Sequence, residues 1–169
     1  MAHGIMTCGL VVESGMLRTR PVGVVNQDGQ IVHFGTLPQY VPNSVTELLD
    51  WTKCSDLHML IKSCVFHYEF EFIHPFSDGN GRMGRLWQSL ILGRLHPLFE
   101  YLPVENMVYA NQEAYYNAIQ HSTATADSGP FIEFMLQEIL NTLKRHQGSL
   151  ISQHNVMEVR DKIRDKFGI

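Results

Sequence analysis

The chain contains His74-Pro75-Phe76-Ser77-Asp78-Gly79-Asn80-Gly81-Arg82-Met83-Gly84-Arg85 at the junction of two apolar segments with helical spacing. The stretch ends by opening the second helix, so its glycines lie at a helix N-terminus. Gly79 and Gly81 allow backbone conformations that turn several N–H groups toward one point. Unpaired N–H donors and the helix dipole both favour an anion at that point. The segment therefore predicts an anion-binding turn between two helices.

Charged side chains surround the predicted turn. Arg82 and Arg85 are three residues apart and share a helix face, and two guanidinium groups in that place suit a polyphosphate. Asp78 adds one carboxylate, and a lone carboxylate together with phosphate oxygens is the usual way in which Mg²⁺ is held. The imidazole of His74 titrates near neutral pH and can accept a proton from a hydroxyl group. These residues predict a nucleotide-phosphate site with a metal ligand and a base.

A structural loop is the alternative interpretation of the same residues. In that case Asp78 caps a helix and the arginines are solvated. For any one residue this interpretation is favoured, but the combination of all of them favours the site. Phe76 is the expected apolar anchor of the loop between the helices. The sequence Gly-x-x-x-x-Gly-Lys-[Ser/Thr] does not occur, so this is not a Walker A loop.

The segments on either side predict helices. Apolar residues recur at helical spacing from Leu57 to Phe72 over much of the circumference, which predicts a central helix. It should end near Ile73, because a residue before proline is pushed away from the helical region. Further helices are expected from Met83 toward Pro97, over Gln112–Ile119 and from Pro130 onward, with a loop at Ser122–Gly129.

The first fifty residues predict a β-hairpin and a short helix. Val22–Val25 and Ile31–Phe34 are apolar or β-branched, and Asp28-Gly29 between them is a turn signal. Ser44-x-x-Glu47 forms a capping box that opens a helix through Trp51. The fold class is therefore mainly α with one small hairpin. Residues 1–148 are expected to form one domain, and 149–169 a C-terminal helical extension that leads to a partner or a further domain.

Composition limits the classes of function. A chain of 169 residues suffices for one domain, and its formal net charge of −4 gives no basic field for nucleic acid or an acidic membrane. Three cysteines without metal-ligand spacing indicate reduced thiols, with Cys64 in the core. No apolar stretch approaches the ~20 residues needed to cross a bilayer, and no secretion signal opens the chain. We therefore expect a cytoplasmic protein.

The loop resembles the signature of the Fic family, His-x-Phe-x-[Asp/Glu]-Gly-Asn-Gly-Arg-x-x-Arg, at every specified position. The likeness extends over about residues 15–145. It includes segments that are similar to the helical scaffold of the family and to the region leading into its flap, namely His67–Glu71, Leu102–Glu105, Tyr115-Tyr116, Pro130–Phe134 and Gly15–Arg18.

The resemblance implies a Fic fold, with a central two-helix motif and a hairpin flap, and it implies protein adenylyl transfer. AMP would move from ATP to a Tyr, Thr or Ser hydroxyl of a target protein, with release of pyrophosphate. The implied roles are His74 as base, Asp78 as Mg²⁺ ligand, and phosphate binding by Gly79, Asn80, Gly81, Arg82 and Arg85. Alternatives are a related diphosphate-using transfer, removal of AMP, or a non-catalytic interaction module.

Partners follow from the same resemblance. The hairpin at Val22–Phe34 would hold the protein substrate by strand pairing, although a hairpin that merely covers the core explains the residues alone equally well. The inhibitory sequence [Ser/Thr]-x-x-x-Glu-[Gly/Asn], found in many family members, is missing from these residues. An inhibitory helix would come from a missing segment or from a separate antitoxin-like protein, or the enzyme is unrestrained. Neither a membrane nor nucleic acid is an expected partner of this chain.

Other histidines and aromatic residues fit structural roles better than ligand roles. His58 and His67 lie on an apolar helix, and His3 is interpreted as a tag remnant or the native start. Trp51 and Trp87 are expected in the core. Tyr115 and Tyr116 are mainly core by spacing, with one of them a candidate for an adenine pocket.

Overall fold

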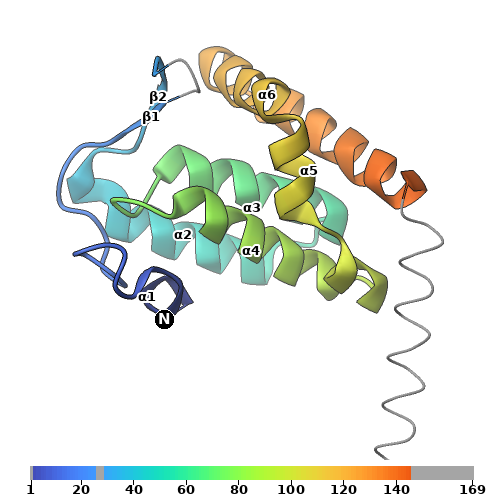
Figure 1. Ribbon diagram of the computed structural model, residues 1–169, viewed down its shortest axis with the longest axis horizontal. Helices are drawn as coiled ribbons and strands as arrows, with labels where there is room; N and C mark the ends of the chain where they lie inside the picture. Colours follow the sequence, from blue (N-terminus) through green and yellow to red (C-terminus); the bar gives the residue numbers. More distant parts are fainter. Residues whose placement is uncertain (1, 26–28, 146–169) are drawn as a thin grey trace, which may run out of the picture.

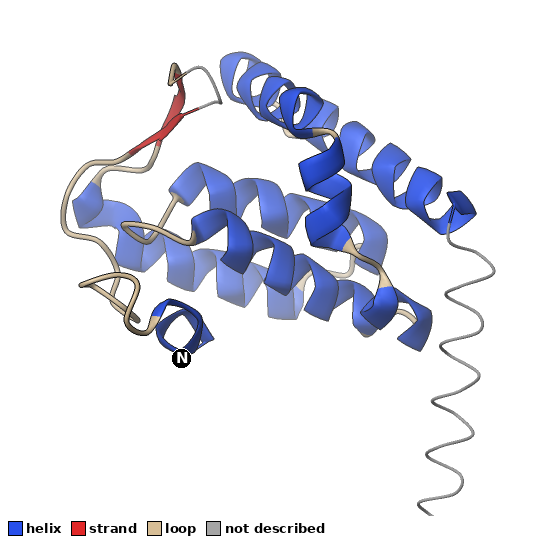
Figure 2. Ribbon diagram, in the orientation of Figure 1, coloured by secondary structure: helices blue, strands red, loops and turns tan. Residues whose placement is uncertain are grey.

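Two antiparallel helices, α3 (Met59–Ile73) and α4 (Asn80–Gly93), form the centre of the structure (Figure 1). The computed structural model describes residues 2–25 and 29–145, which are mainly helical with one small sheet (Figure 2). The connection between α3 and α4 is the loop singled out in the sequence. The predicted central helix and its successor are therefore confirmed, together with the fold class.

Apolar residues cover most of α3 because the helix has a core on each side. Cys64 and Tyr68 pack into one cluster with residues of α5 (Val104–Ala110), α6 (Gln112–Thr125) and a helix over 129–145. Phe66, Phe70 and Ile73 pack into a second cluster with α4 and α2 (Val41–Cys54). Cys64 is fully buried, as expected, and burial raises the pKa of its thiol to about 12.

The start of α2 differs from the prediction. The helix follows a short 3₁₀ turn, η1 (Pro38–Tyr40), and begins at Val41 instead of Ser44, with Pro42 in its first turn. Proline is tolerated there because its fixed φ is helical and the N–H it lacks would be unpaired. No side chain caps this N-terminus. The Ser44–Glu47 pattern therefore lies inside the helix and is not a capping box.

The predicted loop at Ser122–Gly129 is too long. Helix α6 continues through Thr125 and ends where Ala126 takes the left-handed conformation, with φ 52°. Neither glycine nor proline interrupts residues 122–125, and the Thr125 hydroxyl donates to the carbonyl of His121. The helix over 129–145 follows at once, with Pro130 in its first turn. Between α4 and α6, the sequence pattern did not predict η2 (Pro97–Tyr101) and α5.

The predicted hairpin is present. β1 (Gly23–Val25) and β2 (Ile31–Phe34) pair antiparallel, with Gly23 opposite Phe34 and Val24 opposite His33. The hairpin extends from the helices near α6 (Figures 1 and 2). Val25, Ile31 and Phe34 are exposed, so the sheet buries little of its own apolar surface. The described part of the turn includes Gly29 with φ 76°, as the turn prediction requires.

An N-terminal helix, α1 (Ala2–Thr7), was not predicted; it packs beside the α3–α4 loop (Figure 1). The amphipathic C-terminal extension predicted for residues 149–169 lies outside the described residues. Among the helices described, none has the length and apolar character needed to span a bilayer.

Candidate active site

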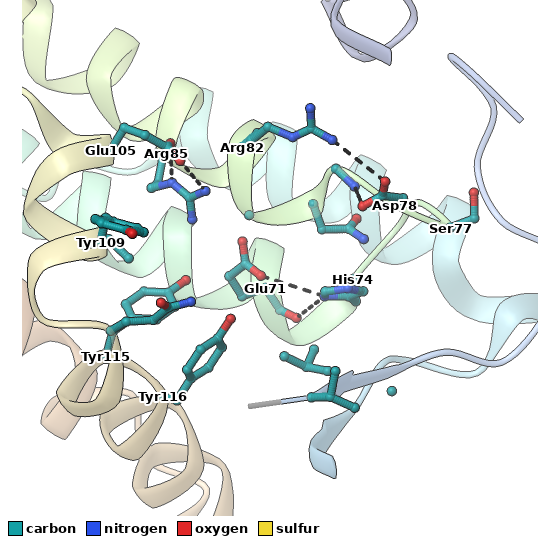
Figure 3. A pocket seen from close by; sticks show the side chains of 18 residues that line it. Glu71, His74, Ser77, Asp78, Arg82, Arg85, Glu105, Tyr109, Tyr115 and Tyr116 are labelled. Atoms are coloured by element: carbon teal, nitrogen blue, oxygen red, sulfur yellow. Dashed lines mark hydrogen bonds and ion pairs between the residues drawn. The ribbon is translucent and has the colours of Figure 1, made fainter. Parts of the chain in front are cut away.

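A cavity of about 460 Å³ lies over the N-terminus of α4, between the hairpin and α5–α6 (Figure 3). Ligand sites usually have volumes of about 300–1,000 Å³, so this cavity has room for a nucleotide. Its wall contains all seven residues that the sequence assigned to the site, which are His74, Asp78, Gly79, Asn80, Gly81, Arg82 and Arg85.

His74 enters this wall through an unusual backbone turn. It follows the last residue of α3 and adopts φ 52°, a left-handed conformation that residues other than glycine seldom adopt. Its Nδ1 lies 3.3 Å from the carbonyl oxygen of Glu71. A carbonyl can only accept, so Nδ1 carries the hydrogen in this contact and Nε2 is the free basic nitrogen. Burial lowers the pKa of His74 to about 4, which keeps the ring neutral at pH 7.

Arg18 holds that backbone turn in place. This guanidinium is almost fully buried and donates to the carbonyls of Ile73, His74, Thr36 and Arg20. The contacts join the segment before the hairpin to the end of α3. His33 of β2 adds a second link, because its Nε2 lies 2.8 Å from the carbonyl of Phe72. The hairpin is thereby fixed beside His74.

Asp78 and Gly79 form the end of the loop at which the sequence predicts an anion. Gly79 precedes α4 with φ 84°, and its N–H donates to Asp78 Oδ1 at 2.6 Å. The first N–H groups of a helix have no acceptor within the helix, and those of α4 open onto the cavity. Asp78 is largely exposed, and its Oδ2 lies 3.8 Å from Nη2 of Arg82.

The side chain of Asn80 binds the backbone of the loop. Its side-chain oxygen accepts from the N–H of Phe76, and its side-chain nitrogen donates to the carbonyl of Phe76. Because the amide is bonded at both ends and buried, it shapes the loop. Phe76 is buried in the core, so its predicted role as the apolar anchor is confirmed.

The two motif arginines have different surroundings. Arg82 is partly exposed beside Asp78, whereas Arg85 is bound to Glu105 of α5 (Figure 3). Both Nε and Nη2 of Arg85 donate to the Glu105 carboxylate, the second at 2.8 Å. The side chain of Arg85 is 16% exposed and that of Glu105 is 61% exposed. The Arg85 guanidinium, which was predicted to bind a phosphate, is therefore held in a bidentate ion pair with Glu105.

Glu71 and His67 form a polar layer beneath the cavity that the sequence analysis did not assign to the site. His67 is fully buried; its Nδ1 donates to Gln88 Oε1 at 2.7 Å and its Nε2 lies 3.1 Å from the hydroxyl of Tyr115. Burial lowers the pKa of His67 to about 4, and the two contacts of its ring agree with the structural role predicted for it. Glu71 is also buried, and burial raises its pKa to about 7. An acidic residue within an apolar helix is the signal that could have identified it.

His3 takes a supporting role in the structure that its interpretation as a tag remnant or the native start did not include. Its ring is buried and stacks on Phe76 with centroids 3.7 Å apart. Nδ1 accepts from the N–H of Gly15, so the hydrogen is on Nε2, which donates to the carbonyl of Asp78 at 2.9 Å. The N-terminal segment therefore supports the back of the loop.

The wall opposite the loop is built by α5 and α6. Tyr109, Tyr115 and Tyr116 lie there, and the labelled tyrosines surround the end of the cavity beyond Glu71 (Figure 3). Tyr115 is buried in the core and Tyr116 is half-buried, which agrees with their predicted positions. Trp51 and Trp87 pack against the second core cluster. His58 is exposed and lies at the start of α3, where its Nδ1 accepts from the N–H of Leu60.

The oxygen donors around the loop fit Mg²⁺ only together with phosphate oxygens and water. No group of three or more histidine, cysteine or acidic side chains within the described ranges could hold a metal on its own. Asp78 nevertheless presents an exposed carboxylate beside the turn that is predicted to bind phosphate. Mg²⁺ is ordinarily bound by one or two carboxylates, substrate phosphates and water, so this arrangement fits that ion together with a nucleotide.

Comparison with known proteins identifies the class to which this fold and site belong. The model of the Fic/DOC family matches residues 3–92, which include most of α1, the hairpin and the α3–α4 loop. The chain belongs to the Fic/DOC family.

Individual relatives agree with this assignment. The chain is 29% identical over 154 residues to protein adenylyltransferase fic-1 of Caenorhabditis elegans, a match that covers 89% of this chain and 28% of that protein. It is 35% identical over 86 residues to a probable protein adenylyltransferase of Aquifex aeolicus, covering 50% of this chain and 25% of the relative. The chain thus spans less than a third of the length of these relatives.

Solved structures share the fold. A Fic family protein from Desulfovibrio desulfuricans G20 superposes with a TM-score of 0.82 at 44% identity, covering 88% of this chain and 45% of the other. Fic-1 of Caenorhabditis elegans superposes with a TM-score of 0.64 at 24% identity, covering 89% of this chain and 42% of the other, and that likeness concerns the fold alone.

Proposed function

We propose that this chain is a protein adenylyltransferase, which transfers AMP from ATP to a hydroxyl side chain of a protein. The observation that carries the proposal is the complete loop from His74 to Arg85 around one cavity, with His74 neutral and its Nε2 free of hydrogen. Relatives that are named protein adenylyltransferases support the same activity.

In the proposed reaction, His74 Nε2 accepts the proton of the target hydroxyl. The hydroxyl oxygen forms a bond with the α-phosphorus of ATP, while the bond between that phosphorus and the bridging oxygen of the β-phosphate breaks. Pyrophosphate leaves with the electron pair of the broken bond. A low pKa favours this role, because His74 is neutral and ready to accept a proton at physiological pH.

Phosphate binding is assigned to the start of α4 and its arginines. The unpaired N–H groups after Gly79 and the charge of Arg82 would hold the phosphates close to His74. Arg85 would reach the terminal phosphates after exchanging its contact with Glu105. Asp78 is the residue that would hold Mg²⁺, and the ion would neutralise charge on the phosphates. Such transfers depend mainly on positioning and charge stabilisation.

The protein substrate is assigned to the hairpin. Its strands lie beside the cavity, and Gly23–Val25 of β1 lines it directly. A target segment that added to this sheet would be held through its main chain, which places few demands on its side chains. Regulation by an inhibitory helix, supplied in trans or by a segment outside these residues, is part of the same proposal.

The test is incubation with α-labelled ATP and Mg²⁺, followed by detection of label on the protein itself and on lysate proteins. We expect labelling that is lost in His74→Ala and kept in His121→Ala, which removes an exposed histidine of α6. Label retained in His74→Ala would exclude His74 as the base. Label that arrives from γ-labelled ATP would indicate a kinase instead, and no label from either nucleotide would contradict the proposed activity.

A further inference from the structure

Glu71 is a buried carboxyl group at the floor of the cavity that the proposed reaction does not yet use. Its side chain is 5% exposed, and its Oε1 has no hydrogen-bond partner among the described residues. Buried polar atoms are nearly always paired, because an unpaired one costs free energy. A carboxyl kept in this condition beside a reactive histidine indicates a role in the chemistry.

The geometry connects Glu71 to His74. Glu71 Oε2 lies 3.7 Å from His74 Nδ1, and the backbone carbonyl of Glu71 lies 3.3 Å from the same nitrogen (Figure 3). Both oxygens therefore face the protonated side of the ring. The left-handed turn at His74 brings the imidazole back over the last turn of α3, so that this contact can form.

The fold leaves space for the Glu71 side chain. A Cβ atom added to Gly84, which faces Glu71 from α4, would lie 2.8 Å from Glu71 Oε1 and 3.0 Å from His67 Cδ2. The glycine at this position, one of the four unspecified positions of the signature, therefore allows α4 to pack directly against the carboxyl group.

Other titratable groups around Glu71 are engaged elsewhere. His67 Nε2 lies 3.9 Å from Glu71 Oε1, but its hydrogen-bond partner is the Tyr115 hydroxyl. Arg85, on α4, acts on Glu71 through its charge, while its Nε and Nη2 donate to Glu105. His74 is thus the group at the reaction centre that Glu71 can serve.

We propose that Glu71 is a positioning residue: its backbone carbonyl holds the hydrogen of His74 on Nδ1, and its carboxylate stabilises the positive charge that His74 acquires from the target hydroxyl. This inference rests on the proposed function. The proton moves from the hydroxyl oxygen to Nε2, and the positive ring then lies beside the Glu71 carboxylate. Loss of that proton to solvent after pyrophosphate has left restores the neutral ring.

The protonation of Glu71 gives the proposal a measurable signature. Only the ionised carboxyl can stabilise a positive ring, and burial raises the pKa of Glu71 to about 7. The turnover rate should therefore fall as the pH drops through about 7, above the range in which His74 itself titrates. If Glu71 were only a packing residue, this limb of the pH profile would be missing.

The decisive variant is Glu71→Gln, which keeps the shape of the side chain and removes its charge. We expect kcat to fall about 10- to 100-fold, because an opposite charge at this distance usually shifts a pKa by about 1–3 units. The ATP dissociation constant should change little, and the acid limb near pH 7 should disappear. The matched control is Glu69→Gln, the same change two residues away on α3, where the half-buried Glu69 lines a different cavity.

Glu71→Asp keeps the charge and withdraws it by one methylene, so it should restore part of the rate and the acid limb. If Glu71→Gln fails to fold, this variant still tests the proposal. Wild-type kcat and an unchanged pH profile in Glu71→Gln would overturn it.

A readout that does not need activity separates this inference from the proposed function. The ¹⁵N signals of the His74 ring, measured without nucleotide, should show hydrogen on Nδ1 and a step near pH 7 caused by the ionisation of Glu71. Glu71→Gln should abolish that step. If the ring signals are insensitive to Glu71, the inference fails even where AMP transfer is observed; if the step is present and no transfer occurs, the proposed function fails alone.

Discussion

Arg85 is the residue whose observed contacts differ most from its proposed role. A guanidinium that is to bind a terminal phosphate is held by both oxygens of Glu105. Nucleotide binding at Arg85 must therefore break an ion pair, and the negative charge of Glu105 also repels the phosphates. Because Glu105 is mostly exposed, water can replace its contact at moderate cost.

Glu105→Gln should accordingly tighten the binding of ATP. We expect the dissociation constant to fall about fivefold, which corresponds to about 1 kcal/mol for a partly exposed ion pair. Titration calorimetry with a non-hydrolysable ATP analogue measures the change. Glu100→Gln, an exposed acidic residue of η2, is the control for a change in net charge. Weaker binding in Glu105→Gln would mean that Glu105 orients Arg85 for the phosphate and does not compete with it.

At the residue scale, the sequence predicted the loop well and its supports poorly. The roles proposed for His74, Asp78 and the arginines rest on residue types at close spacing, which can be recognised without a structure. His3 donates a hydrogen bond to the carbonyl of Asp78, 75 residues away in the sequence, and Arg18 donates one to the carbonyl of His74, 56 residues away. Their partners are backbone atoms, which leave no pattern in a sequence.

At the element scale, the short helix α1 supports the α3–α4 loop from behind. Its His3 fills the space behind the loop, and both ring nitrogens are bonded. His3→Ala would leave a cavity and two backbone groups without their partners. We expect the free energy of unfolding to fall by about 2–3 kcal/mol, measured by urea denaturation. Ile5→Ala, on the exposed face of α1, should change it by less than about 0.5 kcal/mol. An equal loss in both variants would refute a specific role for His3.

The hairpin depends on Arg18, whose hydrogen bonds link it to the end of α3. Lysine carries the same charge but lacks the planar fork with which Arg18 reaches four carbonyls. Arg18→Lys should lower the free energy of unfolding by about 2 kcal/mol and loosen the hairpin, because at least one buried carbonyl loses its donor. Hydrogen exchange of the β1–β2 amides checks the second effect. The exposed Arg20→Lys is the control; unchanged exchange in Arg18→Lys would show that the hairpin does not depend on the Arg18 contacts.

Element boundaries show what local patterns can and cannot decide. The end of α3 was predicted correctly because a proline and its steric effect act within two residues. The predicted start of α2 and the predicted end of α6 were wrong. In both cases a segment without a strong helix preference is part of the helix in the structure. Ser122 illustrates the reason: it is fully buried, and its hydroxyl accepts from the N–H of Phe131. Such tertiary contacts override a turn-like composition.

For the whole molecule, the folding free energy is linked to pH through its buried titratable groups. His67 and His74 have pKa values of about 4 in the folded state, against 6.5 in an unfolded chain, and burial also lowers the pKa of His33. Between pH 6.5 and 4 these histidines are therefore protonated in the unfolded chain but remain neutral in the folded state. Stability falls on acidification wherever the unfolded state binds more protons.

Glu71 has the opposite effect on the pH dependence of stability. Its folded-state pKa of about 7 exceeds the ordinary 4.5, so the folded chain holds a proton there that the unfolded chain releases. Acidification from pH 7 to 4.5 should lower the free energy of unfolding by about 2 kcal/mol in the wild type and by about 5 kcal/mol in Glu71→Gln, where the opposing carboxyl is gone. Urea midpoints at pH 7, 6, 5 and 4.5 measure both slopes. Identical slopes in the two proteins would show that Glu71 does not hold a proton in the folded state, and would remove the basis for its acid limb in catalysis.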